Sequence, residues 1–178
     1  MGAAWRDHGT TIVLAMLILP VGAVAAYLWR RRSLNRRDTV AEIGLVFWTL
    51  PFLGMLFTPQ RAPRSIDLVP LHDLPSWISG DPSTALAQVG GNLLVLAAVG
   101  FFLPIRFAWA AALPRILGIA IATSVLIESL QWVLAIGRVS SVDDVLVNTV
   151  GAVLAAVLSR RWWAAKKTSA KRQILPVA

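Results

Sequence analysis

Apolar residues in this chain are gathered into five long runs that are separated by polar connectors. The runs cover roughly Thr10–Trp29, Val40–Phe57, Ala85–Leu103, Ala112–Ile136 and Val142–Leu158. A helix needs about 17–25 residues to cross the hydrocarbon core of a bilayer, and each run fits that length. Backbone polar groups cannot remain unpaired in lipid, so apolar runs of this length must be helices. The pattern predicts an all-α membrane protein, a bundle of about five transmembrane helices.

Composition and charge support lipid as the solvent and argue against other classes. Hydrophobic residues make up 57% of the chain and charged residues only 15%, whereas a soluble domain carries about 25% charge. A net charge of +8 would suggest nucleic acid in a soluble protein, but here we expect membrane lipids and no nucleic acid as partners. The chain has no cysteine and two histidines far apart in sequence, so we expect no cofactor and no metal site.

Basic residues are concentrated in alternate connectors, and this fixes the expected orientation. Thirteen of the 17 lie in two connectors and the C-terminal tail: Arg30, Arg31, Arg32, Arg36, Arg37, Arg106, Arg115, Arg160, Arg161, Lys166, Lys167, Lys171 and Arg172. The positive-inside rule then places the N-terminus outside and the C-terminus in the cytoplasm of a bacterium, in its cytoplasmic (inner) membrane. We expect one transmembrane domain over residues 1–158 and a basic tail over 159–178. An alternative is that Ala23-Val24-Ala25 is a signal-peptidase site, which would remove the first segment.

The longest connector, about Thr58–Ser83, contains five prolines together with Asp67, His72 and Asp73. A connector of this length is either an ordered lid over the bundle or a flexible link. Its apolar runs favour packing onto the bundle or the membrane surface.

Polar residues inside three of the apolar runs share one helix face in each run. Gln88 and Asn92 are four apart; Ser124, Glu128 and Gln131 follow helical spacing; so do Asp144, Asn148 and Gly151. At 1.5 Å rise per residue, Asn92, Glu128 and Asn148 lie about 9–12 Å from the external ends of their helices. The sequence therefore predicts a polar pocket in the outer leaflet.

Glu128 is the sharpest of these signals, because an acidic side chain inside a membrane costs about 2.5–3.5 kcal/mol on insertion scales. We expect it to face the bundle interior, with Arg138, Asn92, Asn148 or Gln131 as a partner. The plainer interpretation is that these polar groups are interhelical hydrogen bonds that only hold the bundle together.

The segment Arg138–Asp144 contains a helix-start pattern. Ser141-x-x-Asp144, and Ser140-x-x-Asp143 one residue earlier, both match an N-terminal capping box. We expect one of the two aspartates to be a cap. The other is left to pair with Arg138, or to line a site where Arg138 meets an anionic ligand.

Several of these segments, taken in order, resemble the VanZ-like family of small membrane proteins. They are Asn92 to Pro104 with Gly100, Ile127-Glu128-Ser-Leu-Gln131, Arg138, and Val142-Asp143-Asp144-Val-Leu-Val-Asn148-Thr149-Val-Gly151, after the loop Ile66–Leu71. The resemblance covers roughly residues 66–159, and the first two apolar segments lie outside its firm part. Asp67, Leu71 and Ala98 depart from the residues usual at those positions. The family is named for a protein associated with low-level teicoplanin resistance, and family membership does not itself confer an activity.

Three functional hypotheses follow. In the first, the outer-leaflet pocket binds an amphiphile, a lipoglycopeptide or a lipid-linked cell-wall precursor, and the protein is linked to glycopeptide resistance and is no enzyme. Its ligand-binding residues are Asn92, Glu128, Gln131, Arg138, Asp143, Asp144 and Asn148. The second is a small transporter or proton conduit that uses Glu128, and the third is an intramembrane enzyme. No catalytic motif supports the third hypothesis.

Overall fold

The structure is a computed structural model that describes residues 18–59, 65–80 and 82–164. Four helical stretches in this part are long and apolar enough to cross a membrane. They are α2 (Arg36–Leu56), the stretch Gln88–Arg106 that holds α5 (Gly91–Val95) and α6 (Ala97–Arg106), α7 (Leu113–Val133), and α8 (Val142–Ser159) with the 3-10 turn η3 (Arg160–Trp162). The all-α membrane fold expected from the apolar runs is confirmed.

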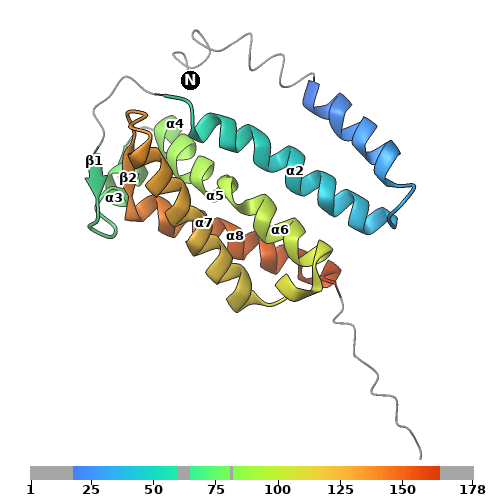
Figure 1. Cartoon of the computed structure of the whole chain (residues 1–178). Helices are drawn as coiled ribbons and strands as arrows, with labels where there is room; N and C mark the ends of the chain where they lie inside the picture. Colours follow the sequence, from blue (N-terminus) through green and yellow to red (C-terminus); the bar gives the residue numbers. More distant parts are fainter. Residues whose placement is uncertain (1–17, 60–64, 81, 165–178) are drawn as a thin grey trace, which may run out of the picture.

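The expected first segment, Thr10–Trp29, lies partly outside the described residues. Its described part is a shorter apolar helix, Ile18–Arg30, which lies beside α2 (Figure 1). Gly22 faces the Phe47 ring of α2, so close that an added Cβ would be 3.1 Å from it.

α8 is the most buried of the four spans and forms the centre of the bundle. It packs against α5, α6 and α7, while α2 packs mainly on α6. Two glycines permit this close approach: a Cβ at Gly100 would overlap the carbonyl group of Ala152, and one at Gly151 would overlap that of Leu93. Small residues at helix contacts let backbones meet in this way. Exposed apolar side chains, such as Leu126 and Leu154, cover the outer faces of the helices, as expected for surfaces in lipid.

The third apolar run is not one regular helix. It begins with α4 (Pro82–Ala85), continues as the π-helical turn η1 (Leu86–Gly90), and is interrupted at Leu96 between α5 and α6. Gln88 lies in the π-turn and is exposed, whereas Asn92 lies in α5 and is half-buried. A π-turn holds more residues per turn than an α-helix, so it changes the angular positions of the residues before it.

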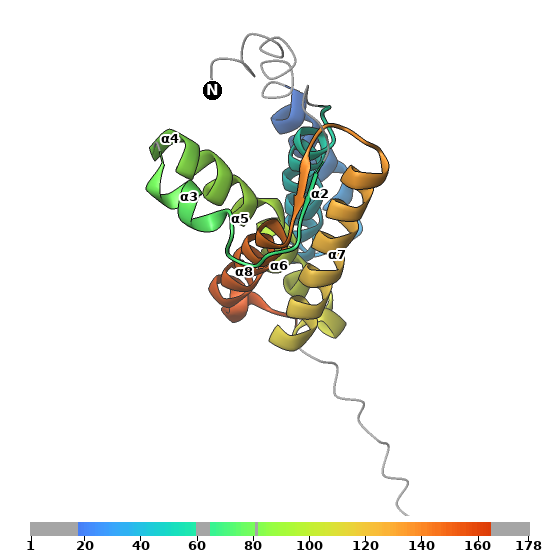
Figure 2. The same ribbon diagram turned by 90° about the vertical axis from the view of Figure 1, so that its left-hand side faces the viewer.

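A feature that the apolar pattern did not predict is a pair of short parallel strands. β1 (Ser65–Asp67) pairs with β2 (Val139–Ser141), with Ile66 opposite Ser140. The short helix α3 (Leu74–Ser79) follows β1 and lies with α4 on the side of the bundle away from α7 (Figure 2). In its described part, the long connector is therefore an ordered element that packs on the bundle.

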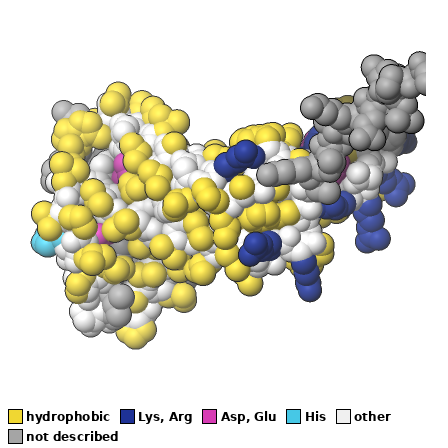
Figure 3. Space-filling view, turned by 90° about the horizontal axis from the view of Figure 1, so that it is seen from below, with side chains coloured by type: hydrophobic (Ala, Val, Ile, Leu, Met, Phe, Trp, Pro, Cys, Tyr) yellow, Lys and Arg dark blue, Asp and Glu magenta, His cyan; other side chains and the backbone are white. Residues whose placement is uncertain are grey.

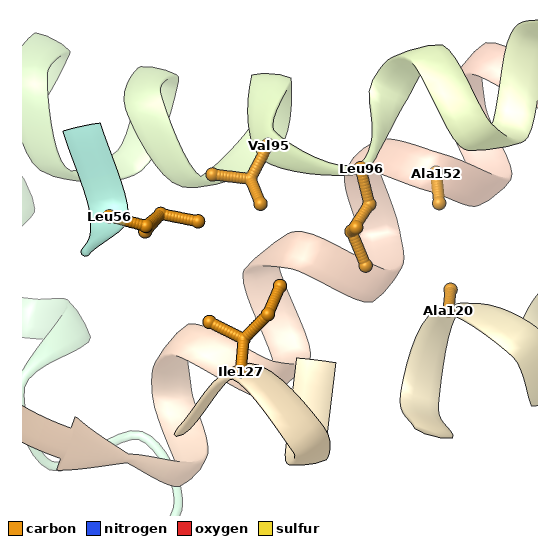
Figure 4. Packing of buried hydrophobic residues seen from close by; sticks show 6 residues of the cluster. All are labelled: Leu56, Val95, Leu96, Ala120, Ile127 and Ala152. Atoms are coloured by element: carbon orange, nitrogen blue, oxygen red, sulfur yellow. The ribbon is translucent and has the colours of Figure 1, made fainter. Parts of the chain in front are cut away.

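An apolar core lies in the middle of the bundle (Figure 4). It consists of residues from α2, α5, α7 and α8 and of the residue between α5 and α6: Leu56, Val95, Leu96, Ala120, Ile127 and Ala152. A second cluster of Ala110, Ile116 and Ala156 lies beyond it. Together the two clusters separate the polar residues at the two ends of the bundle.

The two ends differ in charge. We call one the arginine end, which holds Arg30, Arg31, Arg32, Arg36, Arg37, Arg106, Arg115, Arg160 and Arg161. We call the other the carboxylate end, which holds Glu128, Asp143, Asp144 and the segment from β1 to α3. Figure 3 shows the visible Arg side chains gathered over one half of the molecule and the side chain of His72, the only described histidine, at the opposite tip.

Candidate functional site

Asp143 fastens the connector to the bundle. Its side chain accepts hydrogen bonds from the backbone amides of Leu71 at 2.5 Å, Asp73 at 2.9 Å and Leu74 at 3.1 Å. The residue is only 1% exposed. Free amides at a helix start attract a carboxylate, and Asp143 supplies one to the first turn of α3 from a different helix.

The cap of α8 itself is Ser141, whose Oγ accepts from the amide of Asp143 at 3.1 Å. In a capping box the acidic residue three positions later would accept from the Ser141 amide. That amide instead donates to Glu128 Oε2 at 3.2 Å. The expectation that one aspartate caps α8 is therefore wrong, because Glu128 from α7 takes that place and both aspartates have partners elsewhere.

Glu128 lies inside the bundle, 9% exposed, against the start of α8. Its backbone carbonyl also accepts from Ser140 Oγ at 3.0 Å, so β2 is bound to α7 twice. Among the described residues, none of the four partners expected for its carboxylate bonds to it. Asp144 and Arg138 are near enough to interact with it electrostatically.

Two polar pairs join helices in the same region. The Asn92 side chain donates to the Asp144 carboxylate, which links α5 to α8. Asn148 Nδ2 donates to Ser124 Oγ at 2.9 Å, which links α8 to α7. These are the interhelical hydrogen bonds of the plainer interpretation, but Asn148 Oδ1 has no partner in the part of the chain that is described.

Gln131 and Arg138 bind the end of α2. Gln131 Nε2 donates to the carbonyl of Leu56 at 3.0 Å, and Arg138 Nη2 to that of Met55 at 3.0 Å. Carbonyls at a helix C-terminus lack intrahelical donors and carry partial negative charge, so both contacts are favourable. Burial lowers the pKa of the Arg138 guanidinium, and the nearby carboxylates of Asp144 and Glu128 oppose that effect.

The seven residues singled out from sequence thus lie at one end of the bundle but have different contacts. Glu128, Arg138 and Asp144 interact electrostatically with one another, and Asn92 and Asp143 adjoin them through Asp144. Gln131 is directed to α2, and Asn148 to α7. Among the described residues, Arg138 forms no ion pair with either acidic neighbour within 4.0 Å.

The connector contains a cluster of possible metal ligands that was not predicted from the sequence. One ligand atom from each of Asp67, His72 and Asp73 lies within 4.8 Å of the others, a spacing that suits a metal ion. His72 Nδ1 bonds to the Asp67 carboxylate, which raises the pKa of His72. The amide of Val69 and the His72 side chain lower the pKa of Asp67. The spacing Asp-x-x-x-x-His-Asp was visible in the sequence, but only the turn at Leu71 brings the three together.

Comparison with known proteins gives one match. A family model described as VanZ/LLP1 matches residues 40–163, most of the chain. The matched region begins within α2, earlier than the resemblance indicated, so the second apolar segment belongs to the family region. No curated protein and no solved structure matches the chain.

Proposed function

The chain belongs to the VanZ/LLP1 family and is a multi-pass membrane protein, and from this premise we propose that it binds an amphiphilic ligand at the carboxylate end. The polar head of the ligand meets Glu128, Arg138 and Asp144, and its tails stay in lipid. The proposed ligand is a lipoglycopeptide or a lipid-linked cell-wall precursor. The proposal places the carboxylate end in the outer leaflet of a bacterial cytoplasmic membrane, and it links the protein to glycopeptide resistance.

The observation that carries the proposal is a set of buried polar atoms without partners at this end. Arg138 Nε, Asn148 Oδ1 and Thr149 Oγ1 are buried and bond to nothing in the described residues. Leaving a buried polar group unsatisfied costs about 1–3 kcal/mol, so such groups call for an explanation such as a ligand or an ordered water. Arg138 Nε can donate a hydrogen bond, Asn148 Oδ1 can accept one, and the Thr149 hydroxyl can do either. This set suits a head group rich in amides and hydroxyls.

Apolar surface adjoins the polar cluster, which suits an amphiphile better than a fully polar ligand. Leu68, Val69 and Leu71 in the connector are 58–72% exposed, next to the amides that Asp143 holds. Val125 on α7 and Leu94 on α5 are also exposed. A ligand with its head at the carboxylates has lipid-facing side chains beside it for its tails.

The competing conduit hypothesis lacks a polar path. The apolar core from Leu56 to Ala152 separates Glu128 from the arginine end, and Ala110, Ile116 and Ala156 extend it. Of the two acidic residues described beyond the core, Glu42 is paired with Arg30 and Arg106, and Asp38 bonds to Asn35. A proton path needs polar groups or water at intervals, so this arrangement favours binding over conduction.

Binding of teicoplanin and of a lipid-linked wall-precursor analogue to purified protein in nanodiscs tests the proposal. Glu128→Gln keeps the acceptor for the Ser141 amide but removes the charge, and Arg138→Ala removes the free Nε. We expect each to weaken binding about tenfold or more, as for loss of a buried charged contact. The control Glu42→Gln removes a carboxylate at the other end and leaves binding unchanged. Unchanged affinity in folded Glu128→Gln and Arg138→Ala proteins would overturn the proposal.

A further inference from the structure

A cavity of about 410 Å³ opens at the arginine end, between the first turns of α2, the end of α6 and η3. Its walls are apolar and include Val40, Phe101, Phe102 and Trp162, and Arg36 and Arg37 line it as well. The volume lies within the range of about 300–1,000 Å³ that is usual for small-molecule sites. The apolar core lies between this cavity and Glu128, so it is separate from the proposed amphiphile site.

The cavity is built from close contacts between the elements around it. Gly44 on α2 lets the Phe102 ring approach, since an added Cβ would lie 2.7 Å from Cε atoms of that ring. The rings of Phe101 and Trp162 lie 5.9 Å apart and tilted, which joins α6 to η3. The Arg37 guanidinium donates to the backbone carbonyl of Trp162, which joins α2 to η3. The walls are therefore held from three sides.

The arginines that line the cavity have no carboxylate partner, in contrast to their neighbours. Glu42 is shared by Arg30 at 2.9 Å and Arg106 at 2.7 Å. Asp38 bonds to Asn35, the cap of α2, through its amide and its carboxylate. The Arg37 side chain bonds only to a carbonyl, and the Arg36 side chain has no hydrogen bond or ion pair among the described residues.

The segment of the chain that follows η3 carries no acidic side chain either. Residues 165–178, which follow the end of η3 after two further residues, contain Lys166, Lys167, Lys171 and Arg172 but no aspartate or glutamate. Within residues 18–59, 65–80 and 82–164, no carboxylate pairs with Arg36 or Arg37, which leaves their positive charge for an anionic ligand.

We propose that this cavity is a binding site for an anionic phospholipid. Arg36 and Arg37 bind the phosphate of the head group, and an acyl chain enters along Val40, Phe101 and Phe102. Val40 is 46% exposed and Trp162 40% exposed, so the cavity is reachable from the lipid side. Arginine pairs bind phosphate well through charge-assisted hydrogen bonds, and basic pockets between transmembrane helices suit anionic lipid heads. A free phosphate would leave the apolar walls unused, and a zwitterionic lipid would leave the two positive charges uncompensated.

Native mass spectrometry of protein released from nanodiscs with equal amounts of phosphatidylglycerol and phosphatidylcholine tests the site. We expect the wild type to retain phosphatidylglycerol preferentially. The double substitution Arg36→Gln/Arg37→Gln should reduce that preference about tenfold or more, since each arginine near a lipid surface contributes about a fivefold factor in affinity. The matched control Arg31→Gln/Arg32→Gln removes the same charge from the exposed turn at the same end, away from the cavity, and should change the preference little.

A second variant separates the cavity from the charge. Val40→Trp fills the cavity while it keeps both arginines, and it should also abolish preferential retention. Equal loss in the Arg31→Gln/Arg32→Gln control would show that the general charge of this end attracts the lipid, which overturns the site. Equal retention of both lipids by the wild type, or unchanged retention in Val40→Trp, would overturn it as well.

Discussion

At the arginine end Glu42 accepts from two arginine side chains, whereas at the carboxylate end Asp143 accepts from three backbone amides. The arginines of the first group are 22–40% exposed at their side chains, and Asp143 is 1% exposed. Partly solvated ion pairs contribute little to the free energy of unfolding, because water screens the charges and hydrates them when the pair is broken. When a buried carboxylate that accepts from backbone amides is removed, water does not reach those amides and they remain without an acceptor. The two ends thus use acidic residues differently: one to balance charge, the other to fix the path of the chain.

The largest effect expected from this difference is that of Asp143→Ala. It leaves the amides of Leu71, Asp73 and Leu74 without their acceptor, and we expect the free energy of unfolding to fall by about 3 kcal/mol or more. Glu42→Ala at the arginine end should lower it by about 1 kcal/mol or less. Unfolding by SDS in mixed micelles measures both, and amide exchange should rise at 71–74 only in Asp143→Ala. Equal losses would remove the distinction between the two ends.

The next effect concerns the helix contact that holds the carboxylate end together. Gly151→Ala forces its Cβ into the carbonyl of Leu93, so α5 and α8 must separate, at a cost of about 2 kcal/mol. Gly118 on α7 has open space around it, and Gly118→Ala should be neutral or stabilising by up to about 1 kcal/mol. The same unfolding titration compares the two. A harmless Gly151→Ala would mean that the bundle tolerates a wider α5–α8 spacing.

A double-mutant cycle on Asn92 and Asp144 should give a smaller, measurable coupling. The Asn92 side chain donates to Asp144 between α5 and α8, so we expect a coupling energy of about 0.5–1.5 kcal/mol. A cycle of Asn92→Ala with Glu42→Ala, at opposite ends, should be additive within about 0.5 kcal/mol. Additivity in the first cycle would show that the Asn92–Asp144 bond does not contribute to stability.

The smallest effect is a pH response in the connector. Because the Asp67 carboxylate raises the pKa of His72, the stabilisation is complete below the unfolded-state pKa of about 6.5 and is lost as pH rises through the folded-state pKa. Amide exchange at Val69, which donates to Asp67, should therefore quicken as pH rises through the folded-state pKa of His72, after correction for intrinsic exchange. His72→Asn should remove this dependence, and the arginine end, with no histidine among its described residues, should show none. A pH profile that His72→Asn leaves unaltered would contradict the assignment.

Sequence patterns predicted the helical spans well because a bilayer imposes their length and apolar character. The predicted Val40–Phe57, Ala112–Ile136 and Val142–Leu158 agree with α2, α7 and α8 to within a few residues. The polar faces of α7 and α8 were also readable, since Ser124, Glu128 and Gln131 follow helical spacing and all three are buried. The third run was less accurate, because the π-turn and the break at Leu96 have no marker in apolar periodicity.

Partners of the polar residues were not predictable in the same way. Ser141 and Asp144 match a capping box, yet Glu128, thirteen positions before Ser141, accepts the amide that the local motif reserves for Asp144. Asp143 bonds to residues about 70 positions away. A local motif such as the capping box predicts hydrogen bonds within one helical turn. It fails where tertiary packing brings an acceptor from another helix closer to the same amide.

For this protein, the sequence by itself determined that the helices lie in lipid, which residue ranges form the membrane-spanning helices, and which residues are too polar to face lipid. Those properties follow from residue-by-residue transfer free energy and from helical periodicity, and neither depends on the neighbours of a helix. Tertiary structure alone decided the β1–β2 pair and the role of Asp143 as the anchor of α3. It also decided that Arg138 Nε and Asn148 Oδ1 find no partner among the described residues. Each of these depends on which groups meet across elements when the bundle packs, as α5 and α6 meet α8 at Gly151 and Gly100, and the order of residues along one helix does not specify such contacts.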